Sequence, residues 1–230
     1  MPTPIVVDLS HHNTIPSSLM PAYQAGIRGV IHKMSEGTSM TDSKVDSRRH
    51  LALEAGMLWG LYHFVRPGSM DAQVTYFVGQ AEKAKVCDDQ TLWVLDHEDA
   101  RVSVDDAITF LKLLEQATGR VPVIYSGHVL KEQVAGKARP ELARYPLWLA
   151  QYGTKAVLPN GYTEYWLWQY TEAGHCPGIN SPVDLNHYEG TAGELTYDWI
   201  GEAPAPEAPS SALEVIVYAP SGVKVTVKRA

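Results

Sequence analysis

The triplet Asp96-His97-Glu98 has the residue types and the spacing of an acid–base centre. It ends an apolar run, residues 91–98, that reads as a buried strand. Side chains alternate along a strand, so Asp96 and Glu98 share one face, with backbones roughly 7 Å apart, and His97 takes the other. Two carboxyl groups this close resist double ionisation, so one can keep its proton near neutral pH while its neighbour stays charged. Glycoside hydrolysis requires this division of labour.

Taken alone, these carboxylates could equally be solvated charges at a strand end, and Asp8 could be a turn or cap residue. However, Asp8 ends the first apolar run of the chain and Asp184 lies in the last. If the runs are strands of a closed barrel, their ends meet at one mouth. We therefore expect Asp8, Asp96, Glu98 and Asp184 to converge there.

The elements that must position these side chains are short β-rich runs with helical patterns between them, which are typical of βα units and predict a parallel sheet. Eight strands are expected, the number that closes a (β/α) barrel. They cover residues 5–8, 29–34, 58–64, 91–98, 121–126, 147–152, 165–170 and, more weakly, 183–185.

Two helices are predicted from capping residues. Ser69 precedes an apolar stripe at i, i+3, i+4 spacing, and Ser103 precedes another that ends at Gly119. Beyond Tyr125 the links between strands become short or rich in Pro and Gly. We therefore expect an α/β fold, an incomplete (β/α)8 barrel with some helices missing, over residues 1–201.

The end of the chain differs in composition. Residues 202–212 are rich in Pro and predict a semi-rigid linker. Residues 213–230 alternate around Pro220-Ser221-Gly222 and predict a β-hairpin tail. Because a lone hairpin is marginal in water, we expect it to dock on the barrel, pair with another chain or contact the ligand.

Composition excludes several function classes. The 230 residues carry a net charge of -7 without a cluster of Lys and Arg, which argues against nucleic-acid binding. There is no transmembrane span, so no membrane insertion is expected. Although His11-His12, His63 and His97 suggest metal ligands, they lack the paired spacing of a zinc site, so neither metal nor cofactor is expected. Cys87 and Cys176 are expected to be free thiols.

Aromatic residues gather near the strand ends and could be either core or stacking surfaces for sugar rings. Alternation sorts one group, because Trp166, Trp168 and Tyr170 fall on one strand face, with Leu167 and Gln169 on the other. The full set is Tyr62, Phe64, Tyr125, Trp148, Tyr152, Trp166, Trp168 and Tyr170.

An ordered set of motifs over about residues 4–190 closely resembles family 25 of the glycoside hydrolases, the lysozymes common among bacteriophage endolysins and bacterial autolysins. The motifs are Val7-Asp8-Leu9-Ser10-His11-His12-Asn13, Lys33-Met34-Ser35-Glu36-Gly37-Thr38, Gly60-Leu61-Tyr62-His63-Phe64, Leu95-Asp96-His97-Glu98, Tyr125-Ser126, Pro146-Leu147-Trp148-Leu149-Ala150-Gln151-Tyr152, Trp168-Gln169-Tyr170 and Val183-Asp184-Leu185-Asn186.

This resemblance implies a flattened, helix-poor barrel and a muramidase activity that hydrolyses the β-1,4 bond between N-acetylmuramic acid and N-acetylglucosamine in peptidoglycan. It implies that Glu98 is the general acid, with Asp96, Asp8 and Asp184 as supporting carboxylates. It also implies a sugar groove lined by Tyr62, Tyr125, Trp148 and Gln169, with supporting charges from Lys33 and Glu36. His97 stands where a small apolar residue is more usual, and we expect it to face away from the groove.

Two other functions remain open from the sequence: a barrel that binds wall glycans without cutting them, and another barrel hydrolase such as a chitinase or an amidase. The intact set of acids argues against the first. Residues 1–10 show no signal peptide, so we expect synthesis in the bacterial or host cytoplasm and action on the cell wall after release or export.

Overall fold

The structure is a computed structural model that describes residues 6–15 and 17–200. The predicted linker (202–212) and hairpin tail (213–230) lie outside the described residues, and both stay predictions. In chain order the elements are β1 (Val6–Leu9), α1 (Met20–Gln24), β2 (Gly29–Glu36), β3 (Met40–Thr41), α2 (Val45–Glu54), β4 (Leu58–Phe64), α3 (Met70–Ala84), β5 (Leu92–Asp96), α4 (Val104–Thr118), β6 (Val123–Ser126), α5 (His128–Val134), a 3-10 helix (Pro140–Arg144), β7 (Leu147–Ala150), β8 (Leu167–Gly174), β9 (Val183–His187) and α6 (Ala192–Ile200).

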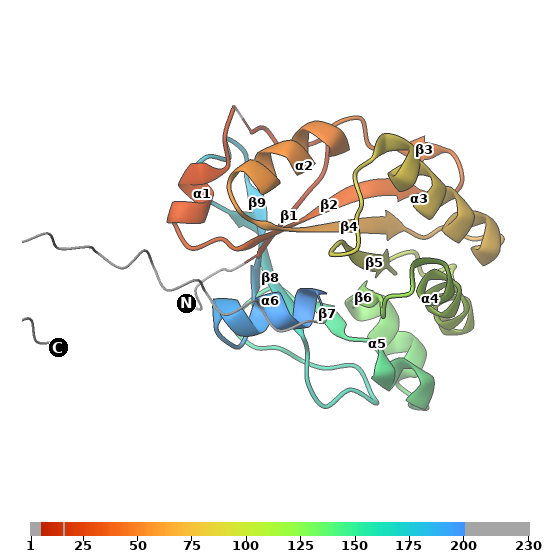
Figure 1. The fold of residues 1–230 in the computed structure, drawn as a ribbon. Helices are drawn as coiled ribbons and strands as arrows, with labels where there is room; N and C mark the ends of the chain where they lie inside the picture. The colour runs from red at the N-terminus through yellow and green to blue at the C-terminus, as the bar shows by residue number, and fades with distance from the viewer. Residues whose placement is uncertain (1–5, 16, 201–230) are drawn as a thin grey trace, which may run out of the picture.

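Eight of these strands close into a barrel, which confirms the predicted fold class (Figure 1). Around the ring they run β1, β2, β4, β5, β6, β7, β8 and β9, and β9 pairs with β1 to close it. The two-residue strand β3, which the sequence did not predict, pairs with the end of β2 outside the ring.

The last strand runs against the others. β1, β2 and β4 to β8 are parallel, whereas β9 is antiparallel to both of its neighbours. The expectation of a parallel sheet is therefore wrong for β9. Only residues 175–182 connect β8 to β9, and a parallel crossover needs a dozen or more residues. The reversal brings the start of β9 beside the carboxyl ends of the other strands.

The two predicted helices form with their predicted caps. The Ser69 hydroxyl accepts from the Ala72 amide at the start of α3. Ser103 and Asp106 form a reciprocal capping box at the start of α4, which ends at Gly119 in the left-handed region with φ 69°. No helix lies between β7 and β8 or between β8 and β9, as expected for an incomplete barrel.

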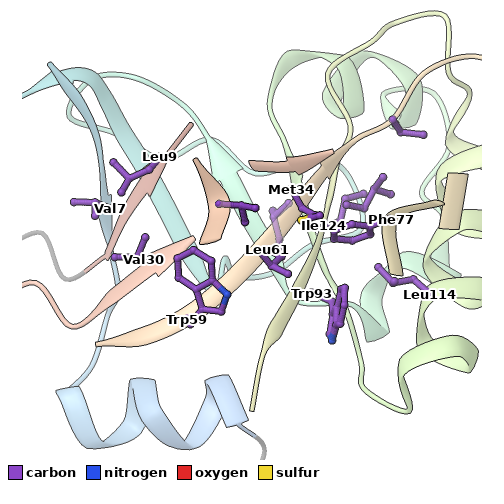
Figure 2. Packing of buried hydrophobic residues seen from close by; sticks show 14 of the residues in the cluster. Val7, Leu9, Val30, Met34, Trp59, Leu61, Phe77, Trp93, Leu114 and Ile124 are labelled. Atoms are coloured by element: carbon purple, nitrogen blue, oxygen red, sulfur yellow. The ribbon is translucent and has the colours of Figure 1, made fainter. Parts of the chain in front are cut away.

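Alternation divides each strand between two cores. Outward side chains pack against the helices in a large cluster that includes Trp59, Phe77 and Trp93 (Figure 2). Inward side chains form a second cluster that contains Val94 and Trp148. Along the inner face the residues change from apolar at the amino ends of the parallel strands to polar at the carboxyl ends, so the barrel has a dry floor and a polar mouth.

Trp199 of α6 closes the floor. A Cβ atom added to Gly29 would lie 3.0 Å from the Trp199 ring, and one added to Gly60 would lie 3.2 Å from it. The two glycines therefore leave the space that the indole fills, and the Trp199 Nε1 donates to the Trp59 carbonyl at 3.0 Å. α6 is thus a structural part of the barrel.

None of the described helices is long and apolar enough to cross a membrane. Cys87 and Cys176 are free thiols, as expected.

Candidate active site

Four carboxylates gather at the polar mouth of the barrel. Asp8 is the third residue of β1, Asp96 is the last of β5, and Glu98 follows two residues later. Asp184 is the second residue of β9 and lies directly opposite Asp8 in the antiparallel register. Asp184 therefore reaches the mouth from the start of its strand rather than from the end.

Burial and mutual repulsion raise the pKa values of the buried acids. Burial, followed by the charge of Asp8, raises the pKa of Asp184 to about 8. Burial raises the pKa of Asp8 to about 6, with hydrogen bonds from Asn186 and Gln169 acting against it. Burial also raises the pKa of Asp96, and the charge of Glu98 adds to it. The acids therefore cannot all be ionised at neutral pH.

Glu98 differs from the other three because its side chain is exposed to solvent at the rim. Desolvation by the surrounding walls still raises its pKa, with His128 opposing and Glu172 adding to the rise. An exposed carboxyl can reach an incoming substrate atom, and a raised pKa favours its protonated form. This combination is what a general acid needs.

Asp8 is held by amides from β9, which pairs with β1, and from β8, the strand after β9 in the barrel. Its Oδ2 accepts from the Asn186 Nδ2 at 2.8 Å and from the Gln169 Nε2 at 3.0 Å. The Tyr125 hydroxyl donates to the Gln169 Oε1 at 2.8 Å, and the Trp148 Nε1 donates to the Asn186 Oδ1 at 2.6 Å. Each amide is thereby fixed with its NH2 group toward Asp8, which orients one carboxylate oxygen rigidly.

These contacts place three of the predicted groove residues beneath the acids. Tyr125, Trp148 and Gln169 are only 7%, 2% and 2% exposed, and the rings of Tyr125 and Trp148 are 4.5 Å apart. They support Asp8 from below and offer little face to a sugar. Tyr62 is half-buried, and its raised pKa reflects burial and then the charges of Asp96, Asp8 and Asp184, which places it beside the acids.

Asp96 lies deepest on the β5 side of the mouth. It is 5% exposed, and its Oδ1 is buried without a hydrogen-bond partner among residues 6–15 and 17–200. Such an atom is costly to leave ionised and unpaired. It is consistent with a carboxyl that shares a proton with the cluster or receives a hydrogen bond from a substrate.

A network of alternating charges forms the wall beside β2 and β4. The Lys33 Nζ donates to the Glu36 Oε2 at 2.6 Å, and Arg66 donates to the Glu36 Oε1 at 2.6 and 2.9 Å. Arg66 also pairs with Asp99 at 3.0 Å. Burial raises the pKa of Glu36, but the hydrogen bonds from Lys33 and Arg66 outweigh it and the net shift is downward. The predicted pair Lys33 and Glu36 is thus brought together and is held by Arg66.

Several residues at the mouth were not predicted to be part of it. Asn186 and Arg66 bind the predicted residues directly. His128, at the start of α5, and Glu172, in β8, act on the pKa of Glu98. Tyr152, which the sequence left open between core and sugar-stacking surface, is 49% exposed, and burial of its hydroxyl followed by the charges of Glu172 and Asp184 raises its pKa. For Asn186 a signal was available in the sequence, because it lies two residues from Asp184 on the same strand face.

His97 faces away from the acids, as expected. It is fully buried, and its Nε2 bonds with the Val102 carbonyl at 3.0 Å. In the part of the chain that the structure describes, no group of three or more His, Cys, Asp or Glu side chains could hold a metal ion. The absence of metal and cofactor stays a prediction.

Trp166, Trp168 and Tyr170 do not form one surface. Trp168 and Tyr170 pack in the outer core, whereas Trp166 precedes β8 and packs against Trp199, with ring centroids 5.8 Å apart. The alternation is correct within β8. It fails at Trp166 because the strand begins one residue later, at Leu167.

Known proteins share this sequence and architecture. Residues 7–179 match the family model described as glycosyl hydrolases family 25. The chain is 32% identical over 182 residues to the uncharacterized protein YegX of Escherichia coli (strain K12), covering 75% of this chain and 64% of that protein. It is 29% identical over 189 residues to Lysozyme M1 of Streptomyces globisporus, covering 74% of this chain and 63% of that protein. The chain thus spans just under two thirds of the length of these two relatives.

Among solved structures, a bacterial lysozyme from Streptomyces coelicolor superposes with a TM-score of 0.74 and 27% identity, covering 86% of this chain and 97% of that one. The matching segment of the family model holds Asp8, Asp96 and Glu98, and the structure adds Asp184 to them across the β1–β9 pair. Because the family model matches most of the chain, the protein belongs to family 25 of the glycosyl hydrolases.

Proposed function

We propose that this protein is a muramidase, a lysozyme that hydrolyses the β-1,4 bond between N-acetylmuramic acid and N-acetylglucosamine in bacterial peptidoglycan. The observation that carries the proposal is that four carboxylates with raised pKa values meet at one mouth of the barrel. They come from β1, from the end of β5 and the residues just after it, and from β9. Membership of a glycosidase family supports cleavage of a glycosidic bond, and the lysozymes among its relatives support a wall glycan as the substrate.

In this mechanism Glu98 is the proton donor. Its exposed carboxyl gives a proton to the glycosidic oxygen as the bond from that oxygen to the anomeric carbon breaks, so the leaving sugar departs as an alcohol. The anomeric carbon is left with a developing positive charge. A water then supplies the hydroxyl group to that carbon, and its second proton returns to the carboxylate cluster, which restores the starting state.

The remaining acids act on the developing charge. Asp8, with a pKa of about 6, is mainly ionised at neutral pH, and its fixed orientation makes it an electrostatic stabiliser that does not need to reorganise. Asp96 is buried, and burial followed by the charge of Glu98 raises its pKa, so we assign it the role of sharing a proton with Glu98. Asp184, with a pKa of about 8, retains its proton at neutral pH and limits the repulsion on Asp8.

We assign substrate contacts to the residues that line the open part of the mouth. Tyr62 lies half-buried beside the acids, and the pair Lys33 and Glu36 forms the adjoining wall. For Tyr125, Trp148 and Gln169 we propose a positioning role, because their polar atoms are engaged in holding Asp8.

The proposal is tested by Glu98→Gln, which keeps the shape of the side chain and removes its proton. Turbidity clearing of purified peptidoglycan should fall at least 100-fold, since a general acid contributes roughly 10²–10⁴-fold. The melting temperature should change little because the side chain is exposed. Glu82→Gln, an exposed change on α3, is the matched control and should clear at the wild-type rate. Clearing by Glu98→Gln at that rate would remove Glu98 from the mechanism.

The products distinguish the alternatives. Mass spectrometry of the digest should find glycan fragments that end in reducing N-acetylmuramic acid. Free stem peptides would identify an amidase, and cleavage of chitin in preference to peptidoglycan would identify a chitinase. Binding of the wall without any product would identify a carbohydrate-binding protein. We further propose that the protein acts on the cell wall after release or export from the cell that makes it.

A further inference from the structure

A second hollow lies at the opposite end of the barrel from the acids. Its lining includes Pro146 and Leu147 at the amino end of β7, Trp166 just before β8, and Tyr188 just after β9. Because the parallel strands all point toward the mouth and β9 points away from it, these positions lie at the floor. The hollow has a volume of about 740 Å³, within the range of roughly 300–1,000 Å³ typical of ligand pockets.

The walls of this hollow combine aromatic rings with carboxylates. The Tyr188 hydroxyl donates to the Asp198 Oδ2 at 2.6 Å, and the Tyr165 hydroxyl donates to the Glu189 Oε1. Both acids are exposed, so each presents a hydrogen-bond acceptor that its tyrosine holds in place. Trp166 is a further aromatic residue of the lining.

The hollow continues along α6. A neighbouring depression of about 630 Å³ shares Tyr188, Glu189 and Asp198 with it and extends to Tyr197. Tyr197 is 51% exposed, so its ring is available to a ligand. We call the two depressions together the floor groove. It is long, open and lined with aromatic residues, which suits a polymer better than a compact small molecule.

We propose that the floor groove is a second carbohydrate-binding site that holds a glycan strand of N-acetylated amino sugars away from the catalytic mouth. Sugar rings offer apolar C–H faces to aromatic rings and many O–H and N–H donors to carboxylates. The groove supplies both, through Tyr165, Tyr197 and the oriented acids. The choice of this polymer rests on the proposed muramidase function.

Charge narrows the class of ligand. Glu164, Glu189, Glu194 and Asp198 line the groove, and its cation, Arg144, pairs with Glu115 outside it. Nucleic acids and anionic lipid surfaces would be repelled. A basic peptide would also be attracted by these acids, but flat aromatic walls add more to the binding of sugar rings than to the binding of lysine side chains.

The test uses the full chain and tetra-N-acetylchitotetraose as the soluble probe. Isothermal titration calorimetry with the wild-type protein should show two binding sites, one at the mouth and one in the floor groove. The variant Tyr165→Ala/Tyr197→Ala should lose one of them or weaken it by roughly 5- to 10-fold, from the loss of two aromatic contacts. Tyr76→Ala, a half-buried tyrosine change on α3, is the control and should keep both sites.

A second measurement separates this proposal from the muramidase proposal. The double variant should cleave soluble peptidoglycan fragments at the wild-type kcat and clear intact cell walls more slowly at low enzyme concentration. If the wild type cleaved nothing but the double variant still lost a chitotetraose site, the muramidase proposal would fail and this one would stand. Unchanged binding stoichiometry and affinity in the double variant would overturn the floor-groove proposal. It would also be overturned if oligolysine displaced tetra-N-acetylchitotetraose from the floor groove and the sugar bound there only weakly.

Discussion

Asp184→Asn should make the protein more stable at alkaline pH and less active, because the amide never ionises and cannot take part in proton exchange within the carboxylate cluster. Asp184 lies opposite Asp8 on paired strands, and its pKa is raised from 3.8 to about 8. A raised pKa means that the folded state binds the proton more tightly than the unfolded state. The ionised carboxylate therefore costs stability, and the cost is absent below about pH 4, grows between pH 4 and 8, and is complete above pH 8. Asparagine has the same shape and never ionises.

The size of the effect follows from the shift. About four pKa units at roughly 1.4 kcal/mol each set an upper limit near 6 kcal/mol. Asp184 is partly exposed and shares protons with Asp8, so solvent screening and coupling reduce this to about 2–3 kcal/mol. At roughly 2–4 °C per kcal/mol for a chain of this size, the melting temperature at pH 8.5 should rise by about 5–10 °C.

Thermal unfolding measured by circular dichroism at pH 4 and pH 8.5 is the assay. The variant should match the wild type at pH 4 and exceed it at pH 8.5, while its clearing of peptidoglycan falls. Asp89→Asn, at an exposed position, is the matched control and should change neither property. A difference between variant and wild type that is the same at both pH values would refute the reasoning, because it would not come from ionisation.

Three further predictions follow from other contacts. Gln169→Leu removes a hydrogen bond to ionised Asp8 worth about 1.5–3 kcal/mol. The pKa of Asp8 should then rise by roughly 1–2 units from about 6, and the acid limb of the pH–rate profile should move to higher pH with it. The control Gln116→Leu, on the exposed face of α4, should leave the profile unchanged. Ser103→Ala breaks the capping box of α4 and should lower the free energy of unfolding in urea by about 1 kcal/mol without changing kcat. Deletion of residues 213–230 should spare cleavage of soluble fragments and alter either the oligomeric state in light scattering or the amount of protein pulled down with cell walls. If neither measurement changed, the predicted role of the tail would be contradicted.

The sequence was sufficient for the parts of the fold that depend on local patterns. Ser69 and Ser103 mark their helices because a cap requires only the next three residues. The inward face of each strand follows from alternation, so the position of Asp8, Asp96 and Asp184 on one surface could be predicted. The direction of β9 could not be inferred, because the predicted connection, residues 171–182, is long enough for a parallel crossover, and it becomes too short only because β8 extends to Gly174.

The functional state of a side chain depended on contacts between distant segments, which local patterns do not contain. Trp148 was predicted to line the groove, but closure of the barrel buries it and directs its Nε1 to Asn186, 38 residues away. Asn186 in turn binds Asp8 across 178 residues. The sequence places Asn186 on the strand face of Asp184, but it does not reveal that its amide binds Asp8. Likewise, Arg66 is recognisable as a wall residue only once Glu36 and Asp99 are seen beside it.

The pairing of β1 with β9 also has a consequence for the order of biosynthesis. The first strand of the barrel cannot complete its pairing until the last strand has been synthesised. Asp8 acquires its partners Asp184 and Asn186 only after nearly the whole described chain has been made. Contacts between such distant segments form late in folding. A nascent or prematurely terminated chain therefore has no assembled mouth. The topology of the barrel therefore makes the carboxylate cluster depend on completion of the last strand.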